Sequence, residues 1–240
     1  MFGRFLEIGI ATTDIVASVQ FYERLKFSQL ITTDAWTHRY GVLGDQRARL
    51  GLHERDIPSP APTFVLPDLK HSLRHLLRAK LEPQLTDFGE ESVHRVLLRD
   101  PGDNPVMLLE ARTYSPAAPG TLAEQSLCGY FSHLSLPQSD FAAARDFWER
   151  GGFVAMSEEE RPYPHLPLTS DHLSLAFHQP RTFDAPLLVF ECADIAATAA
   201  RLRELGITPS THMPRGVDRP KALLIEAPDT TALLLLAPSD

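Results

Sequence analysis

The segment FLEIGIATTDIVASVQFYERLKF, residues 5–27, returns in outline as FSHLSLPQSDFAAARDFWERGGF, residues 131–153. In both copies a short apolar run precedes an aspartate, Asp14 in the first and Asp140 in the second. The two aspartates are 126 positions apart. A fixed period with matched residues at the same places is the mark of repeated structural units. The sequence therefore predicts two homologous halves.

Each half is itself double. Asp68 and Asp194 are also 126 positions apart, and each follows the preceding aspartate of its half by 54 positions. The same offset places Asp103 on Asp229 near the end of each half. The chain therefore contains four related modules, two in each half.

The local pattern of the first module is repeated in the others. Leu6, Ile8 and Ile10 alternate with small or polar residues, which predicts a half-buried strand. Asp14 is a good helix N-cap, and the residues that follow place apolar side chains on one helical face. We therefore expect each module to begin with a strand and a helix and to continue with further strands.

Composition limits the classes of function. The net charge of −8 and the scattered basic residues argue against nucleic acid and anionic membranes as partners. No apolar run reaches membrane-spanning length, and the N-terminus lacks a secretion signal, so we expect a cytoplasmic protein. Cys128 and Cys192 have no metal-type spacing, which favours free thiols.

The module pattern resembles the vicinal oxygen chelate superfamily, which includes glyoxalase I, bleomycin-resistance proteins, fosfomycin-resistance enzymes and extradiol dioxygenases. The residues that carry the resemblance are Glu7–Phe27, Phe64–Leu81, Asp100–Leu109, His133–Phe153, Val189–Ile207 and Glu226–Leu235. The resemblance implies an α+β fold in which four βαβββ modules form two fused domains, each with a cleft.

The expected domain bounds follow the repeat. The first glyoxalase-like domain covers residues 1–113, with modules at about 1–58 and 59–113. A linker rich in Pro, Ala, Gly and Ser covers 114–127. The second domain covers 128–240, with modules at about 128–183 and 184–240. Four modules can pair within one chain or swap between two, so a monomer and a homodimer are both open.

The resemblance also implies four metal-ligand positions in each cleft, as found in metalloenzyme members. In this chain those positions fall on Glu7 and His133, on about Gly51 and Ala176, on about Ala61 and Leu187, and on Met107 and Leu233. One polar residue remains per half. Because a catalytic divalent metal needs about three protein ligands, we expect neither half to keep the standard site.

Glu7 and His133 are the candidate catalytic residues. A carboxylate in an apolar cleft is suited to act as a general base, and the alternative for Glu7 is an ion pair with Arg49. His133 stands at a ligand position, and its alternative is a structural, hydrogen-bonded histidine.

The stretch DHLSLAFH, Asp171–His178, places His172, Ser174 and His178 on one strand face. His53 and Arg49 align with His178 and Ser174. These side chains are candidates for binding a polar ligand or for lying on a wet rim. The alternative is a rebuilt metal site made by His133, His172, His178 and Glu191.

Aromatic residues supply the remaining candidates. Trp36, His38 and Tyr40 alternate on one strand face, and Tyr163 and His165 are their counterparts in the second half. Such residues line a planar-ligand site or cover the core at a strand edge. Trp148 is expected in the core. His71, His75 and His94 are expected on the surface, and no helix is expected to pair histidines at metal spacing.

These observations lead to one functional expectation and its rivals. The leading expectation is a protein of the bleomycin-resistance type that binds a small aromatic or polar-planar molecule, with no cofactor and no divalent metal. The rival is a metal-dependent lyase, isomerase or extradiol-type dioxygenase with a histidine-rich site in the second half. A third possibility is that the second half alone keeps chemistry and the first half serves as scaffold. Enzymatic activity itself stays open.

Overall fold

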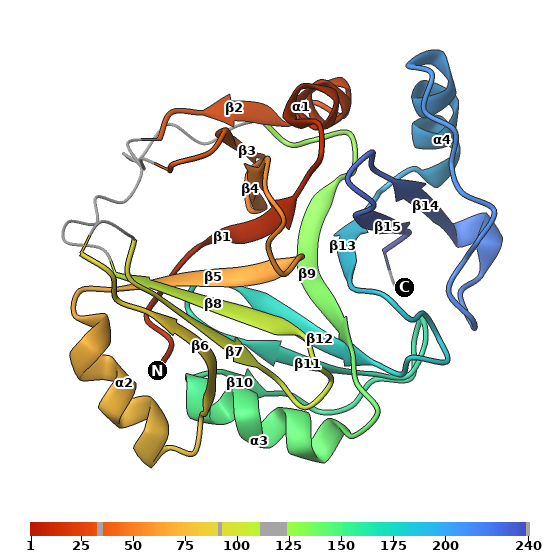
Figure 1. The fold of residues 1–240 in the computed structure, drawn as a ribbon. Coiled ribbons are helices and arrows are strands. Elements are labelled where there is room, and N and C mark those ends of the chain that lie inside the picture. Colours follow the sequence, from red (N-terminus) through yellow and green to blue (C-terminus); the bar gives the residue numbers. More distant parts are fainter. Residues whose placement is uncertain (33–35, 91–92, 111–123, 239–240) are drawn as a thin grey trace.

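Strands and helices follow one another in the order of repeated modules (Figure 1). The computed structural model describes residues 1–32, 36–90, 93–110 and 124–238. The first half contains β1 (Arg4–Ala11), α1 (Ile15–Arg24), β2 (Ser28–Leu30), β3 (Tyr40–Gly44), β4 (Arg49–His53), β5 (Ala61–Leu66), α2 (Leu69–Arg78), β6 (Pro83–Asp87), β7 (Arg95–Arg99) and β8 (Pro105–Glu110). The second half contains β9 (Tyr130–Pro137), α3 (Phe141–Gly151), β10 (Val154–Ala155), β11 (His165–Thr169), β12 (Ser174–His178), β13 (Leu187–Glu191), α4 (Ile195–Glu204), β14 (Ala222–Glu226) and β15 (Ala232–Leu236).

Each of the four helices begins directly after one of the repeated aspartates. The side chains of Asp14, Asp68, Asp140 and Asp194 accept hydrogen bonds of 2.8–3.0 Å from the backbone N–H three residues later. An N-cap of this kind satisfies a helical N–H that has no partner within the helix. The helix starts predicted from the repeat are therefore confirmed.

The strands form two mixed sheets, one in each half. The first has the order β2-β3-β4-β1-β5-β8-β7-β6 and the second the order β10-β11-β12-β9-β13-β15-β14. In each sheet the two modules join through their first strands, β1 with β5 and β9 with β13, which are antiparallel. The expected α+β fold with four modules is confirmed, but the fourth module differs, because no strand is found between α4 and β14 in the part of the chain described. No helix of the described segments is long and apolar enough to cross a membrane.

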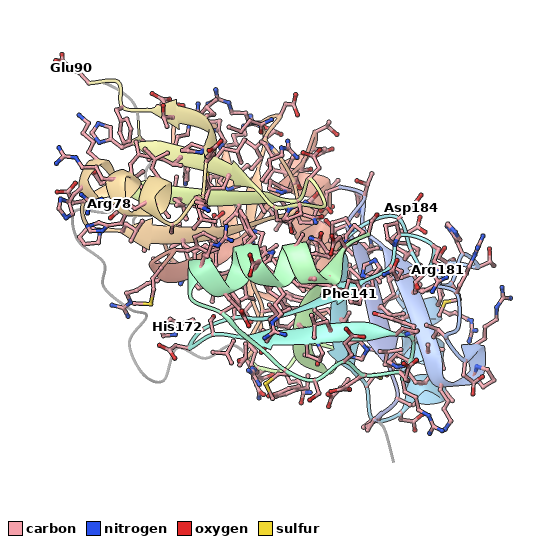
Figure 2. All side chains as sticks on the ribbon, turned by 90° about the horizontal axis from the view of Figure 1, so that it is seen from below. Arg78, Glu90, Phe141, His172, Arg181 and Asp184 are labelled. Atoms are coloured by element: carbon pink, nitrogen blue, oxygen red, sulfur yellow. The ribbon has the colours of Figure 1, made fainter. Side chains whose placement is uncertain are left out.

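One continuous hydrophobic core lies between the two halves. The ring of Phe2 lies 5.7 Å from that of Trp148, and Phe27 lies 6.2 Å from Phe190. Helix α3 packs beside the strands of the first half, as two views at right angles show (Figures 1 and 2). Trp148 is fully buried, which confirms its expected place in the core.

The predicted linker 114–127 lies outside the described residues up to position 123. From residue 124 onward the chain returns to the first half, where the Leu127 N–H donates to the carbonyl of Leu25 at 2.8 Å. The domain bounds proposed from the sequence stay predictions. Both sheets are formed within one chain.

The last turn of each half shows that the repeat offset is not constant. Asp103 and Thr230 both have positive φ, 65° and 69°, and each N–H bonds a carbonyl three residues earlier. The equivalent of Asp103 is therefore Thr230, and the alignment with Asp229 was wrong by one residue. As a result Leu234, rather than Leu233, occupies the position of Met107, because Leu233 lies in the shared core.

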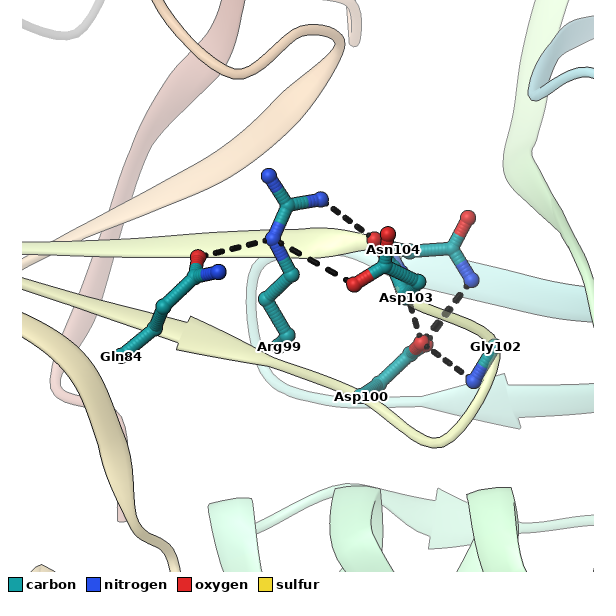
Figure 3. Close-up of polar contacts among 6 residues, drawn as sticks. All are labelled: Gln84, Arg99, Asp100, Gly102, Asp103 and Asn104. Carbon is teal, nitrogen blue, oxygen red and sulfur yellow. Dashed lines mark hydrogen bonds and ion pairs between the residues drawn. The ribbon is translucent and has the colours of Figure 1, made fainter.

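Asp100, at the end of β7, connects the two halves. Its carboxylate accepts hydrogen bonds of 2.9 Å from the N–H groups of Gly102 and Asn104, which shapes the turn before β8 (Figure 3). It also accepts from Trp148 Nε1 at 3.1 Å and from the Gln138 side-chain amide, both in the second half. Burial raises the pKa of Asp100. One buried carboxylate therefore satisfies donors from both halves.

Replacing Asp100 by Ala should destabilise the protein strongly. Each buried donor left without a partner costs about 1–3 kcal/mol, so the total loss should be about 3–5 kcal/mol. Denaturant unfolding measures this loss. The control is Asp103→Asn in the same turn, whose exposed side chain should change stability by less than about 0.5 kcal/mol. Equal losses for the two variants would contradict the connecting role of Asp100.

Candidate functional site

Polar side chains gather on the face of the first sheet that is turned away from the shared core. We call this the cleft face. Ile8 and Ile10 of β1 belong to the core, so Glu7, which precedes them and points the other way, lies on the cleft face. Tyr40 on β3 pairs in register with His53 on β4, and β4 runs parallel to β1. Residues distant in sequence are thereby brought to one place.

Glu7 is fully buried, and its carboxylate is held from two sides. The Tyr40 hydroxyl donates to Oε2, and His53 Nε2 lies 3.2 Å from Oε1. The predicted alternative, an ion pair of Glu7 with Arg49, is not what forms. The space for the carboxylate exists because residue 51 is glycine, since a Cβ at Gly51 would overlap the Glu7 carboxyl group.

His38 and Trp36 extend this network toward the surface. His38 Nε2 lies 2.9 Å from His53 Nδ1, and the Trp36 ring meets the His53 ring edge-on at 4.9 Å. The Trp36 ring also lies 5.7 Å from that of Tyr40. Trp36, His38, Tyr40 and His53 therefore come together, but Trp36 and His38 precede β3 and do not lie on one strand with Tyr40 as predicted. Their rings also pack on one another.

The hydrogen bonds form a relay with a free end. When Glu7 is ionised it can only accept, so His53 donates from Nε2. Neutral His53 then accepts at Nδ1 from His38 Nε2–H, which leaves His38 Nδ1 as a lone pair. If His53 instead carries both protons, His38 presents Nδ1–H. The outer nitrogen of His38 therefore accepts while His53 is neutral, and it donates only when the relay holds one additional proton.

A small cavity of about 30 Å³ lies above the relay. Its lining includes Trp36 and His38, the cations Arg55 and Arg95, and an apolar wall that contains Met107. Trp36 Nε1 and His38 Nδ1 are both buried and have no hydrogen-bond partner within the described residues. Burial and the neighbouring His53, Arg55 and Arg95 lower the pKa of His38. The cavity thus has unused hydrogen-bonding atoms and a positive rim.

In the second half the histidines also gather, but most of them are engaged by the protein. His178 is fully buried, with Nδ1 at 2.7 Å from Ser135 Oγ and Nε2 at 2.9 Å from the Phe183 carbonyl. His165 Nδ1 donates to the carbonyl of Tyr163 at 2.9 Å. Burial lowers the pKa of His178 to about 4. Both rings are therefore held by hydrogen bonds to the protein itself.

His133 occupies the position of Glu7 in this half. Its ring stacks on His165 at 6.1 Å, and its Nδ1 lies 3.1 Å from Ser132 Oγ. Burial, followed by the proximity of His165 and His178, lowers its pKa to about 3. His133 Nε2 is buried without a hydrogen-bond partner in the described part of the chain. Of the predicted residues, His165 and His178 lie near His133, and burial disfavours the protonated form of the His133 ring.

The cleft face of the second sheet is covered by apolar side chains. The buried members of this cluster are Tyr163, Phe183, Leu187, Val189, Ala222, Leu224, Ala232 and Leu234. Met213 and Val217, from the irregular segment before β14, pack against them. This filling does not support the hypothesis that the second half alone keeps the chemistry, because the cavity described above lies in the first half.

The side chains present do not fit the divalent metal of the superfamily's metalloenzymes. Within the described ranges no group of three or more His, Cys, Asp or Glu side chains is placed to hold a metal ion. For the predicted rebuilt site, His172 lies exposed in the turn before β12 (Figure 2), and Glu191 is exposed at the end of β13. The predicted set does not assemble as a metal site among the described residues, and His172 precedes β12, so it does not share the strand face of His178 as expected.

The other predicted binding residues lie at the margin. Arg49 and Ser174 begin β4 and β12, are partly buried, and do not line the cavity. The sequence reasoning missed Arg55 and Arg95, because they come from separate modules and belong to no motif. It also missed a histidine pair, since His71 and His75 lie on α2 with their Nε2 atoms 3.2 Å apart.

Gly51→Ala should disrupt the site from within. The added methyl group would overlap the Glu7 carboxylate, so that Glu7 must leave Tyr40 or His53, at a cost of about 1–3 kcal/mol. Thermal or denaturant unfolding measures the loss. The matched control is Gly41→Ala, whose Cβ would meet only Ile15 at 3.9 Å. A loss no larger at Gly51 than at Gly41 would contradict the described fit.

The buried histidine of the second half predicts acid sensitivity. His178 has a pKa of about 4 in the folded protein and about 6.5 when unfolded, so the unfolded chain binds more protons between these values. The contribution of His178 to the free energy of unfolding should be constant above about pH 6.5. Below that pH the free energy of unfolding should fall, by up to about 3 kcal/mol near pH 4. His178→Asn should reduce this slope in denaturant unfolding, and His133 should account for the slope that remains, whereas His172→Asn should leave the slope unchanged. An unchanged slope in His178→Asn would contradict the assignment.

Comparison with known proteins identifies the fold. No protein-family model matches the chain, and no curated protein matches it. Solved structures do match. A catechol 2,3-dioxygenase superposes with a TM-score of 0.58 at 15% identity, covering 99% of this chain and 90% of that one. BphC, a halotolerant catechol dioxygenase, gives 0.59 at 16%, with 99% and 88% covered. A single-residue variant of homoprotocatechuate 2,3-dioxygenase from Brevibacterium fuscum gives 0.63 at 14%, with 99% and 72% covered. The chain therefore has the fold of the extradiol dioxygenases, as its resemblance to the vicinal oxygen chelate superfamily implied.

Proposed function

We propose that the protein binds a small organic molecule at the first-half cavity and does so without a divalent metal. The observation that carries this proposal is the pair of unused buried atoms at the cavity, Trp36 Nε1 and His38 Nδ1, which lack partners among the residues described. A buried polar atom without a partner costs about 1–3 kcal/mol. A ligand that supplies the missing partners would recover that free energy.

The relay beneath the cavity supports binding rather than metal coordination. The two carboxylate oxygens of Glu7 already accept from Tyr40 and His53, and His53 Nδ1 already contacts His38. A metal ion would have to break these bonds before it could be held. The relay instead fixes the rings that face the ligand, which lowers the ordering cost of binding.

The volume of the cavity limits what can enter. About 30 Å³ is room for a head group of the size of one or two water molecules. The remainder of the ligand would lie along the apolar wall near Met107 and toward the mouth. A ring-sized ligand would require the Trp36 side chain to move, so a small polar head group replaces the planar ligand first expected.

A thermal-shift screen with short-chain amides, amines, alcohols and carboxylates tests the proposal. At a hundred times its Kd a ligand stabilises the native state by about 2.7 kcal/mol, which corresponds to a shift of roughly 5–10 °C. The shift should persist after treatment with a chelator. His38→Phe keeps an aromatic ring but removes both ring nitrogens, and it should abolish the shift.

The matched control is His94→Phe, a half-buried histidine of the same domain that does not line the cavity. It should keep the ligand-induced shift. Loss of the shift on chelation and its return with Fe, Mn, Ni or Zn would overturn the metal-free proposal. Equal responses of the two variants would move the site away from His38.

A further inference from the structure

We propose that the head group held in the cavity is the carboxylate of a small organic acid, bound by Arg55 and Arg95. The inference rests on the proposed binding function and names its ligand class. It depends on the balance of charge at the cavity, on the direction of the unused hydrogen bonds, and on a contrast with the second half.

The charges that remain available at the cavity are positive. Glu7 is the acidic side chain in the lining, and its two carboxylate oxygens already contact the Tyr40 hydroxyl and His53 Nε2. Arg55 is exposed, and within the described segments its guanidinium forms no ion pair. Arg95 is 28% exposed and has an ion pair with Asp87 through Nε at 3.3 Å, which leaves the rest of its five N–H donors. A guanidinium binds a carboxylate in preference to a neutral oxygen.

One unused hydrogen-bonding atom can serve only an acceptor. The indole Nε1–H of Trp36 is buried without a partner among the described residues and can only donate. Together with the guanidinium groups of Arg55 and Arg95, which line the same cavity, it offers donors to both oxygens of a carboxylate. An ammonium head group would find no unused carboxylate among the described residues that line the cavity.

The second half shows that this arrangement is particular to the first. By register, Arg95 pairs with Leu109 as Ala222 pairs with Leu236, so an alanine of the apolar cluster stands where Arg95 stands. The residue that corresponds to Arg55, two positions beyond the equivalent histidine, is Pro180. The second sheet therefore forms without either cation, although among the described residues its fourth module lacks a strand that corresponds to β6.

The apolar wall indicates the body of the acid. Ile57, Pro58, Ala61, Met107 and Leu109 line the same cavity as the two arginines. A carboxylate attached to a short hydrocarbon chain would place its charge between the guanidinium groups and its chain against this wall. The ligand class is therefore a short monocarboxylic acid.

Matched acids and amides test the inference by calorimetry: propionate with propionamide, and butyrate with butyramide. The members of a pair have nearly the same shape and differ in charge. The acid should bind at least about tenfold more tightly than its amide. Raising the salt concentration from about 0.05 to about 0.5 M should lower the affinity for the acid and leave the affinity for the amide unchanged.

Arg55→Gln should lower the affinity for the acids by roughly fivefold to tenfold. The stability of the protein should not change, because Arg55 is exposed and forms no ion pair among the residues described. Arg55→Gln/Arg95→Gln should remove the preference for acids. The control is Arg39→Gln, an exposed arginine that pairs with Glu54 and does not line the cavity; it should stay within about twofold of the unaltered protein.

The outcomes separate the two proposals. Equal affinity for acids and amides would overturn the carboxylate inference and leave the proposed binding function standing. If neither the acids nor the amides bind but amines or alcohols do, the carboxylate inference is likewise overturned and the proposed binding function stands. Failure of every class would overturn both. Arg55 is exposed, so its replacement should not disturb the fold of the site. If Arg55→Gln binds acids over amides with the same preference as the unaltered protein, the role of the arginines in binding the carboxylate is overturned.

Discussion

Both sheets bury one face in a single core, and this shared burial constrains the rest of the molecule. Phe2 of one half packs on Trp148 of the other, and Asp100 satisfies donors on both sides. A residue that serves this core cannot change without loss in both halves, since closely packed interiors tolerate few changes of volume. The equivalent core residues Tyr22 and Trp148 differ but both remain large and buried, whereas the opposite faces of the two sheets differ in chemical character.

The divergence follows from what a buried carboxylate requires. Taking Glu7 out of water is costly unless donors surround it, and here Tyr40 and His53 supply them in a space that Gly51 leaves open. In the second half the equivalent of Glu7 is His133, and Ala176 stands in place of Gly51. Without a carboxylate to satisfy, that cleft face closes with apolar side chains.

The sequence could predict what depends on local pattern. The four aspartate caps, the module order and the burial of Trp148 all follow from short-range signals that repeat. The one-residue change of offset near Asp103 could not be read from identities, because it depends on backbone conformation in a turn. The repeat pattern also could not predict which of the two halves would keep a cavity. Phe183 and Met213 close the second one from segments far along the chain.

The same limit explains how the missing metal ligands were interpreted. Position 51, where the resemblance places a ligand, has no side chain, which from sequence alone suggests simple loss. In the structure that absence is what admits the Glu7 carboxylate, and the carboxylate in turn orders His53 and His38. The residues that replaced the ligand set are therefore interdependent. Each is explained by the others and by the cavity they enclose, and this interdependence favours a different use of the cleft over its decay.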